Sequence, residues 1–321
     1  MTGVTIVICC YNSSERLPKT LEYIAKQKVR ELLLWEVIIV DNNSSDDTNG
    51  VALKEWQRFK TNASFSIIVE SRAGLSFARE AGVERAKFEY VIFCDDDNWL
   101  CDTYLQTAFD IMEQNPRIGA LGGQSDSYSD VPFPDWWNEY KSGYAVGKQA
   151  PVERDVSDTK YLWGAGLVTR KALLDKVFSK KTPFLLSDRK GKALVSGGDT
   201  EICHRILLLG YNLYYSEKLF FTHHITEERL TIGYRTKLHE GFDKAFPVLM
   251  TYIFVIDLVA NPFPQRVKIF LKTIIKVFLM PLGFFKGQKK HVSDTLSVLL
   301  RQPALSKDDN IRSIIRFLKE Q

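Results

Sequence analysis

The sequence predicts an α/β protein with a mostly parallel, doubly wound sheet, followed by a basic helical extension. Short apolar runs rich in β-branched residues alternate with stretches whose apolar residues recur at helical spacing. The fourth apolar run, Tyr90 to Cys94, shows no polar alternation, which is typical of a strand covered on both faces. Residues 1–228 carry 27 basic and 32 acidic side chains, whereas residues 229–321 carry 16 and 7, so the net charge changes from −5 to +9.

The elements follow one another in strand-helix order along the first part of the chain. Strands are expected at residues 5–10, 36–40, 65–69 and 90–94, and helices at 15–28, from the turn 41–45 to about residue 60, and at 75–86. Further along, a helix is expected at 199–209, ended by Gly210, and a strand at 212–216. Such alternation favours parallel strands joined by crossover helices.

Composition excludes several classes of protein. The 321 residues are 45% hydrophobic and 26% charged, which argues against a disordered chain and against a polytopic membrane protein. Five cysteines are too few for a disulfide scaffold, so a reducing compartment is expected. The apolar run 4–10 has no basic flank and reads as a first strand instead of a secretion signal, which favours the cytoplasm.

Polar residues follow each of the four predicted strands. They are Tyr11-Asn12, Asp41-Asn42, Glu70-Ser71-Arg72 and Asp95-Asp96-Asp97. In open parallel sheets, ligands bind outside the carboxyl ends of the strands. We therefore expect a binding site at this edge of the sheet.

Three adjacent carboxylates after a buried strand indicate a cation site. Like charges at this spacing repel each other unless a cation is close. Carboxylates, water and phosphate oxygens are the ligands that Mg²⁺ and Mn²⁺ prefer, so the cofactor expected here is Mn²⁺ or Mg²⁺. The competing interpretation is a solvated acidic turn before the next helix.

The run Val91 to Asn98 resembles the Asp-x-Asp motif of the family 2 glycosyltransferases, which have the GT-A fold, a Rossmann-like sheet. Five more segments resemble family motifs in the family's order, namely 6–12, 38–44, 72–82, 163–166 and 197–202. The resemblance covers about residues 3–228. It implies a metal-dependent enzyme that transfers a sugar, with inversion, from a nucleoside-diphosphate sugar to a hydroxyl of a glycan or lipid-linked glycan, and it leaves UDP, GDP and dTDP open.

The resemblance also implies roles for individual residues. Contacts to the nucleotide sugar are expected from Tyr11, Asn12, Asp41, Arg72, Gly74, Arg79, Asp95 and Asp96, and metal ligation from Asp97 and His223. Asp199, a carboxylate at the start of a helix, is expected to take the proton from the acceptor hydroxyl, with Glu201 as the next candidate. Asp199 alternatively caps that helix. Arg79 either organises the acidic loop, approaches the diphosphate, or is an exposed helix arginine.

The chain departs from the family pattern at several positions. Gly198 replaces the glutamate that usually precedes the catalytic aspartate in the motif Gly-Glu-Asp-x-Glu-Leu, whereas Asp199 and Glu201 are kept. Glu80 stands in place of an asparagine, and Asn98 follows the Asp-x-Asp motif. The loss of the glutamate puts the tuning of the base and its acceptor contacts in question.

The C-terminal part predicts a membrane-surface element. The apolar segment 246–264 is interrupted by Asp257, Asn261 and two prolines, too often for a spanning helix. In 267–279, three lysines at positions 268, 272 and 276 share one face of an otherwise apolar helix, which is typical of interfacial helices. The alternative is a helix packed on the catalytic domain. A nucleic-acid partner is not expected.

These observations predict a domain at 1–228 that binds the nucleotide sugar and an extension at 229–321. We expect the protein to be peripheral on the inner face of the cytoplasmic membrane. Two alternatives stay open. A sugar nucleotidyltransferase would need a Gly-rich phosphate loop after the first strand, which residues 10–13 do not provide. An inactive binding homologue would be supported by Gly198.

Overall fold

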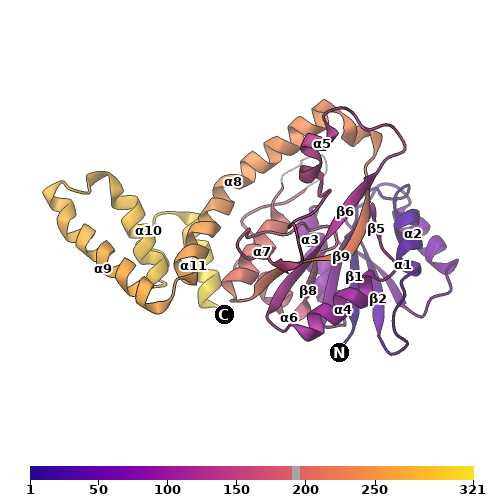
Figure 1. The fold of residues 1–321 in the computed structure, drawn as a ribbon, viewed down its shortest axis with the longest axis horizontal. Coiled ribbons are helices and arrows are strands. Elements are labelled where there is room, and N and C mark those ends of the chain that lie inside the picture. The colour runs from indigo at the N-terminus through magenta and orange to yellow at the C-terminus, as the bar shows by residue number, and fades with distance from the viewer. Residues whose placement is uncertain (190–195) are drawn as a thin grey trace.

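The structure is a computed structural model that describes residues 1–189 and 196–321. A nine-stranded sheet forms its centre, helices cover both faces, and the C-terminal helices extend away from the sheet (Figure 1). The strands are β1 (Val4–Cys10), β2 (Trp35–Asp41), β3 (Ser64–Val69), β4 (Tyr90–Asp95), β5 (Asn98–Leu100), β6 (Ile118–Tyr128), β7 (Arg154–Asp155), β8 (Val168–Arg170) and β9 (Asn212–His224). The predicted α/β class with a helical extension is confirmed.

Helices follow or interrupt these strands along the whole chain. They are α1 (Leu17–Ala25), α2 (Thr48–Gln57), α3 (Leu75–Arg85), α4 (Tyr104–Gln114), α5 (Trp137–Tyr140), α6 (Lys171–Val177), α7 (Gly198–Leu208), α8 (Ile232–Ala260), α9 (Phe263–Leu279), α10 (Lys289–Leu299) and α11 (Asp309–Lys319). The described part of the chain also contains five short 3₁₀ helices, one of which is η2 (Glu227–Leu230).

The N-terminal half of the sheet is parallel throughout. Strand β1 pairs with β2 and β4, and β2 pairs with β3, each in parallel register. These four strands and the helices between them lie within a few residues of the predicted ranges. The strand order along the whole sheet is β3-β2-β1-β4-β8-β6-β9-β5.

The other half of the sheet is mixed. Strand β8 runs antiparallel to β4 and β6, and β5 runs antiparallel to β9, while β6 and β9 are parallel. The sequence predicts a strand at 212–216 and also places His223 on a strand, in the run 220–224; β9 joins both segments and ends at His224. It does so because β6 accompanies it along its length, across an irregularity between Gly122 and Gln124.

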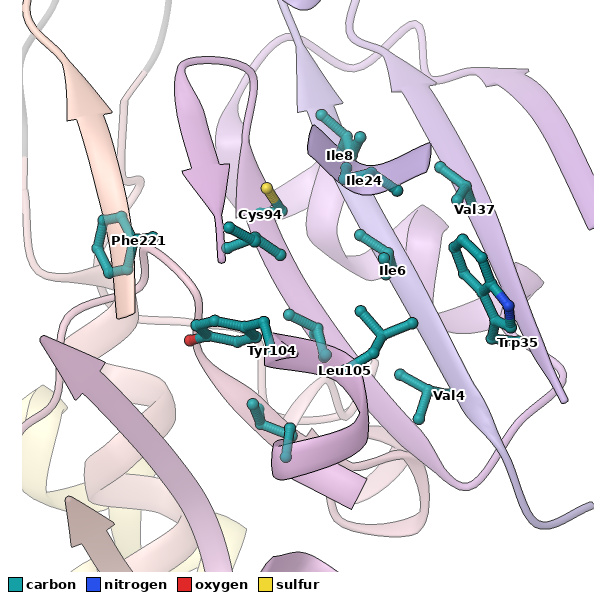
Figure 2. Close-up of a cluster of buried hydrophobic side chains, with 14 of the residues drawn as sticks. Val4, Ile6, Ile8, Ile24, Trp35, Val37, Cys94, Tyr104, Leu105 and Phe221 are labelled. Atoms are coloured by element: carbon teal, nitrogen blue, oxygen red, sulfur yellow. The ribbon is translucent and has the colours of Figure 1, made fainter. Parts of the chain in front are cut away.

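Two apolar layers fix the helices to the sheet. On one face, Ile6 and Ile8 of β1 pack with Ile24 of α1 and with Tyr104 and Leu105 of α4 (Figure 2). On the opposite face, side chains from β1 and β2 pack against α3, α6 and α7. Alternate residues of one strand thus serve both layers, as the period of two in a strand requires.

Helix α3 lies unusually close to β1 because Gly82 faces the sheet. A Cβ atom at position 82 would overlap Cγ1 of Val7 and would lie 3.2–3.3 Å from methyl groups of Val7 and Val40. This close approach fixes the distance of α3 from the strands, and α3 carries Arg79.

The C-terminal helices are attached through a buried polar network. Arg205 of α7, which is 1% exposed, forms an ion pair with Glu201 at 3.1 Å and donates to the carbonyls of Val177, Thr182 and Pro183. The hydroxyl of Tyr252 on α8 donates to Glu201 at 2.7 Å. Apolar residues of α8, α10 and α11 close around this contact.

The apolar segment 246–264 is more regular than its composition suggested. Helix α8 continues through Pro247, and the chain turns only at Asn261 and Pro262. None of the helices in the described part of the chain is long and apolar enough to cross a membrane by itself. Helices α8 and α9 meet the length and composition criterion only as a pair, which is bent by 115°.

We predict that Gly82→Ala lowers the free energy of unfolding by about 1–3 kcal/mol, because the added methyl group overpacks the contact between α3 and β1. Urea unfolding measures this loss of free energy. Gly233→Ala is the matched control, since position 233 in α8 has no atom within 4 Å of the added carbon. In the Val7→Ala background, where the overlapping methyl groups are removed, Gly82→Ala should cost less unfolding free energy than it does in wild type. If Gly82→Ala alone has the unfolding free energy of wild type, the packing described here is contradicted.

Candidate functional site

The strand register brings the polar strand ends together. Cys10 pairs with Asp41, and Cys9 pairs with Asp95, so β1, β2 and β4 end at one level. The predicted site residues after these strands therefore share one edge of the sheet. Antiparallel pairing of β5 with β9 sets His223 opposite Asn98 and adds it to the same edge.

Asn12 and Asp41 shape the first two loops. Asn12 has a left-handed backbone (φ 51°), and its Oδ1 accepts from the backbone N–H of Ser45 at 2.8 Å. The buried carboxylate of Asp41 accepts from the N–H of Ser44 at 2.9 Å and from the side chain of Asn49 at 2.7 Å. Asn12 Oδ1 also accepts from the hydroxyl of Ser45 at 3.2 Å, so it holds the loop, whereas each oxygen of Asp41 has one donor and retains a lone pair for a ligand. The neighbouring Tyr11 is 48% exposed, which leaves its ring free to stack.

Asn42 ties the loop after β3 to the loop after β2. Its amide donates to the carbonyl of Arg72 at 2.8 Å, and its Oδ1 accepts from the N–H of Gly74 at 2.7 Å. Arg72 forms ion pairs with Glu70 at 2.7 Å and Glu80 at 3.2 Å, and half of its side chain is exposed. Arg72 and Gly74 are thus held at the start of α3, at the ligand edge.

Asp96 has partners inside the protein. Its carboxylate forms an ion pair with Arg16 at 2.7 Å and accepts from the hydroxyl of Ser13, and its backbone carbonyl accepts from Thr20 at 2.8 Å. These contacts fasten the acidic turn to the start of α1. Asp95 and Asp97 are left to face the rest of the site.

Asp97 and His223 face each other at the centre of the edge. Asp97 Oδ1 lies 3.4 Å from Nε2 of His223, and Arg229 Nη1 lies 2.8 Å from Asp97 Oδ2 and 3.3 Å from the same Nε2. His223 Nδ1 is 2.7 Å from the carbonyl of Tyr144, which can only accept, so Nδ1 carries the proton and Nε2 presents a lone pair. Burial opposes the charge of Asp97, but the guanidinium of Arg229 outweighs it and holds the pKa of this carboxyl group well below the usual range.

Arg79 is buried among three carboxylates. It is 4% exposed, which excludes the exposed-helix interpretation, and its Nη1 lies 3.4 Å from Asp188 Oδ2. Desolvation disfavours the guanidinium charge, but Asp188, Asp95 and Asp199 more than compensate and raise its pKa. Burial raises the pKa of Asp188, which Arg79 opposes, and burial together with Asp97 raises the pKa of Asp95. One cation thus organises acidic groups from β4, from the segment before α7 and from α7 itself.

Asp199 lies in the first turn of α7. Gly197, with φ 105°, occupies the N-cap position of this helix and no side chain caps it, so Asp199 is not the N-cap. Asp199 Oδ2 accepts from the N–H of Gly164 at 2.9 Å, and Oδ1 accepts from the N–H of Thr200 at 2.8 Å. Backbone donors therefore orient the carboxylate of Asp199 at the edge where Arg79 lies.

Glu201, the second candidate base, is fully engaged elsewhere. It is 0% exposed and accepts from the N–H groups of Leu185 and Leu186 at 2.8 and 2.9 Å. It also accepts from Tyr252 and pairs with Arg205. Three of these donors bind Oε1 and one binds Oε2, and the side chain is completely buried, so Glu201 anchors helices and is not exposed to a substrate proton.

The donor set at Asp97 and His223 fits a divalent cation. Among the residues that the structure describes, no three His, Cys, Asp or Glu side chains converge into a metal cage. Such a cage is not required, because Mg²⁺ bound with nucleotides takes one or two protein ligands and fills its shell with water and phosphate oxygens. A carbonyl partner on the second ring nitrogen, as His223 has in Tyr144, is the usual support of a metal-ligating histidine. A cation at this position requires the guanidinium of Arg229 to move aside.

Sequence reasoning missed two charged residues of the site. Asp188 lies in an irregular segment that resembles no motif, and Arg229 follows the last segment that resembles the family. The burial of Arg79, which the sequence left open, requires a carboxylate partner, and α3 offers none at helical spacing, so the partner had to come from a distant part of the chain. The sequence contains no further signal that selects position 188.

Comparison with known proteins gives the family. The sequence profile described as Glycosyl transferase family 2 matches residues 5–178, more than half of the chain. The chain is 30% identical to a poly-beta-1,6-N-acetyl-D-glucosamine synthase of Staphylococcus epidermidis over 122 residues, 38% of this chain and 28% of that protein. It is 27% identical to the poly(ribitol-phosphate) beta-N-acetylglucosaminyltransferase TarP of Staphylococcus aureus over 181 residues, 55% of this chain and 51% of TarP.

The same fold occurs in solved structures. Residues 1–349 of S. aureus TarS, in complex with UDP-GlcNAc, superpose with a TM-score of 0.56 and 14% identity, covering 99% of this chain and 88% of that one. GalNAc-T7 with UDP, GalNAc and Mn²⁺ gives a TM-score of 0.53 with 14% identity over 75% of this chain and 48% of that one. The chain spans about half or less of the length of the curated relatives described above. The profile match identifies the chain as a member of glycosyl transferase family 2, and its fold is the one found in these solved structures.

Proposed function

We propose that this protein transfers N-acetylglucosamine from UDP-GlcNAc, with inversion, to a hydroxyl group of a glycan or lipid-linked glycan. The names of TarP and of the S. epidermidis synthase, and the UDP-GlcNAc complex of TarS, support this donor. The observation that carries the proposal is the position of Asp199: a carboxylate held by backbone donors, at the same strand-end edge as Asp97 and His223.

Asp199 acts as the general base. The acceptor oxygen attacks the anomeric carbon while its proton passes to a carboxylate oxygen of Asp199, and the bond from that carbon to the diphosphate oxygen breaks. UDP leaves with the bonding electrons, so no covalent sugar–enzyme intermediate forms. The N-terminal end of α7 adds a favourable electrostatic field for the Asp199 carboxylate before the proton arrives.

The loops after β1, β2 and β3 bind the nucleotide. Asp41 offers free acceptors to the nucleoside, Asn12 shapes the loop beside it, Tyr11 offers an exposed ring, and the half-exposed guanidinium of Arg72 is available to the diphosphate. Arg79 and Asp96 hold the acidic turn in place. Asp95 adds a further carboxylate on the side of the site where the nucleotide sugar binds.

Asp97 and His223 would hold Mn²⁺ or Mg²⁺, with Asp95 behind them. When bound, the cation supplies positive charge to the diphosphate as UDP departs. Arg229 neutralises Asp97 in the absence of the cation. His223 keeps its lone pair toward the site through its bond to the Tyr144 carbonyl.

A donor panel tests the function. We expect the protein with Mn²⁺ to release UDP from UDP-GlcNAc in water, faster than from UDP-glucose, and to release no nucleotide from GDP-mannose or dTDP-rhamnose. A sugar nucleotidyltransferase would instead form a nucleotide sugar from a sugar phosphate and a nucleoside triphosphate. Failure to turn over any sugar nucleotide, with or without Mn²⁺, would favour an inactive binding homologue.

We predict that Asp199→Asn folds and binds UDP like wild type but releases UDP from UDP-GlcNAc about 10²–10⁴-fold more slowly, the usual contribution of a general base. The amide keeps an oxygen for the N–H of Gly164 and cannot take a proton. Asp175→Asn, an exposed position on α6, is the control. Wild-type turnover of Asp199→Asn would exclude this residue as the base.

We predict that Asp97→Asn weakens Mn²⁺ binding in the presence of UDP by at least about tenfold, because a hard cation loses its carboxylate ligand. Electron paramagnetic resonance of free Mn²⁺ measures the binding without turnover. Asp130→Asn, which removes the exposed partner of His224, serves as the control. Equal Mn²⁺ affinity of Asp97→Asn and wild type would place the cation elsewhere.

We further propose that the extension at residues 229–321 binds the inner face of the cytoplasmic membrane through α9. Five apolar side chains form an exposed stripe along this helix, namely Phe263, Val267, Leu271, Ile275 and Phe278. Lys268, Lys272 and Lys276 each follow a stripe residue by one position and therefore form the adjoining strip. Figure 1 shows α9 projecting from the body of the protein.

The charge of α9 selects an anionic lipid surface over a second copy of the chain. The helix contains Arg266 and the three lysines and no acidic residue, so two copies packed along the stripe would bring like charges together. Exposed apolar residues beside lysines match the interface of an anionic bilayer. An anionic membrane surface is also where a lipid-linked acceptor would be found.

We predict that changing Lys268, Lys272 and Lys276 to glutamate releases the protein from anionic vesicles, since each basic residue near such a surface contributes about 1 kcal/mol. UDP release from UDP-GlcNAc should not change. The control changes the exposed Lys54, Lys60 and Lys181 to glutamate, which alters net charge equally. Co-sedimentation with anionic and neutral vesicles measures binding, and equal partitioning of both triple variants would contradict the assignment of α9.

A further inference from the structure

Gly198 occupies the position at which the motif Gly-Glu-Asp-x-Glu-Leu carries its first glutamate, and a different carboxylate fills the space. A Cβ atom at Gly198 would overlap the Asp188 carboxylate, at 2.6 Å from its Cγ and 3.0 Å from its Cβ. Gly198 is the first residue of α7 and has no positive φ, so its backbone would accept a side chain. The carboxylate of Asp188 is what excludes a side chain at position 198.

Asp188 is built into the site. It is 4% exposed, although it lies in an irregular segment with φ 54°. Its Oδ2 lies 3.4 Å from Nη1 of Arg79, and its Oδ1 accepts from the N–H of Arg189 at 2.9 Å. A buried carboxylate in a strained backbone conformation persists only where the surroundings hold it.

The ion pair of Asp188 determines where the guanidinium of Arg79 points. Arg79 and Asp199 both lie against Gly164: a Cβ atom there would be 2.6 Å from Nη2 of Arg79 and 3.0 Å from Cβ of Asp199. The two side chains are therefore neighbours, yet Arg79 pairs with Asp188, while Asp199 is held by backbone N–H groups. Without the charge of Asp188, Asp199 is the adjacent carboxylate to which the guanidinium would turn.

We propose that Asp188 is a positioning residue that takes the place of the side chain missing at Gly198 and, by engaging Arg79, leaves Asp199 free to accept the substrate proton. The inference rests on the proposed role of Asp199 as the base. It assigns to Asp188 no contact with the donor. A pair between Arg79 and Asp199 would stabilise the charged carboxylate and make it a poorer proton acceptor.

Moving the carboxylate from position 188 to position 198 tests the proposal. The variants are Asp188→Asn, Asp188→Gly, Gly198→Glu and the double variant Asp188→Gly/Gly198→Glu. Glycine suits the left-handed backbone of position 188, and a glutamate at the start of α7 is favoured by the helix field. The measurements are kcat and KM for UDP release from UDP-GlcNAc with water as acceptor, the Kd of UDP, and the unfolding midpoint.

We expect Asp188→Asn and Asp188→Gly to lower kcat by about 10- to 100-fold, the order seen when a reacting group is misplaced, with KM and the Kd of UDP unchanged. The double variant should be at least about tenfold faster than Asp188→Gly, because the carboxylate is restored. Gly198→Glu alone should lower the unfolding midpoint, and Asp188→Gly should relieve this loss. A merely structural Asp188 would not be rescued from position 198.

The outcomes separate this inference from the proposed function. Two results would overturn the role of Asp188: a wild-type kcat in Asp188→Asn, or a double variant that folds and binds UDP but is no faster than Asp188→Gly. In either case, slow turnover of Asp199→Asn would still support Asp199 as the base. Wild-type kcat in Asp199→Asn overturns both. Additive effects of the two substitutions on the unfolding midpoint would show that the side chains at 188 and 198 do not share one space, which also overturns the inference.

Discussion

The buried guanidinium of Arg79 is the interaction on which the rest of the site depends. It lies inside the protein with its ion pair to Asp188, and Asp95 and Asp199 add to the field that keeps it charged. Asp95 is more than 90 residues away in the sequence from Asp188 and Asp199. A cluster of buried carboxylates with no counter-charge would be protonated or would unfold the site. Arg79 therefore joins the end of β4 to the start of α7.

The position of Arg79 is in turn set by packing. Gly82 lets α3 approach β1 until methyl groups of Val7 and Val40 touch the helix, and Arg79 is one turn earlier on the same helix. On the far side, Glu201 and Arg205 hold α7 against Tyr252 of α8. The helix that carries Asp199 is thus fixed between the sheet and the C-terminal extension, so the extension supports α7.

The first half of the fold could be predicted because its strands are uninterrupted apolar runs, so periodicity alone locates β1, β2, β3 and β4 within one or two residues. Regions whose structure depends on tertiary contacts could not be predicted in this way. Strand β9 outlasts its apolar segment because β6 pairs with it, and α8 runs through Pro247 with Ala245 buried before the proline and Tyr252 buried after it. In the site, the approach of His223 to Asp97 was expected from the family resemblance. Asp188 and Arg229 were not, because their proximity arises from loops whose course no local pattern encodes.

The most direct test of this account is the free energy of unfolding of Arg79→Met, measured in urea beside wild type. Methionine keeps the volume and apolar stem of the arginine and removes its charge. If one guanidinium compensates the buried carboxylates, unfolding should cost about 3–5 kcal/mol less, as when one partner of a buried ion pair is removed. A loss below about 1 kcal/mol, the range of surface pairs, would contradict the central role of Arg79.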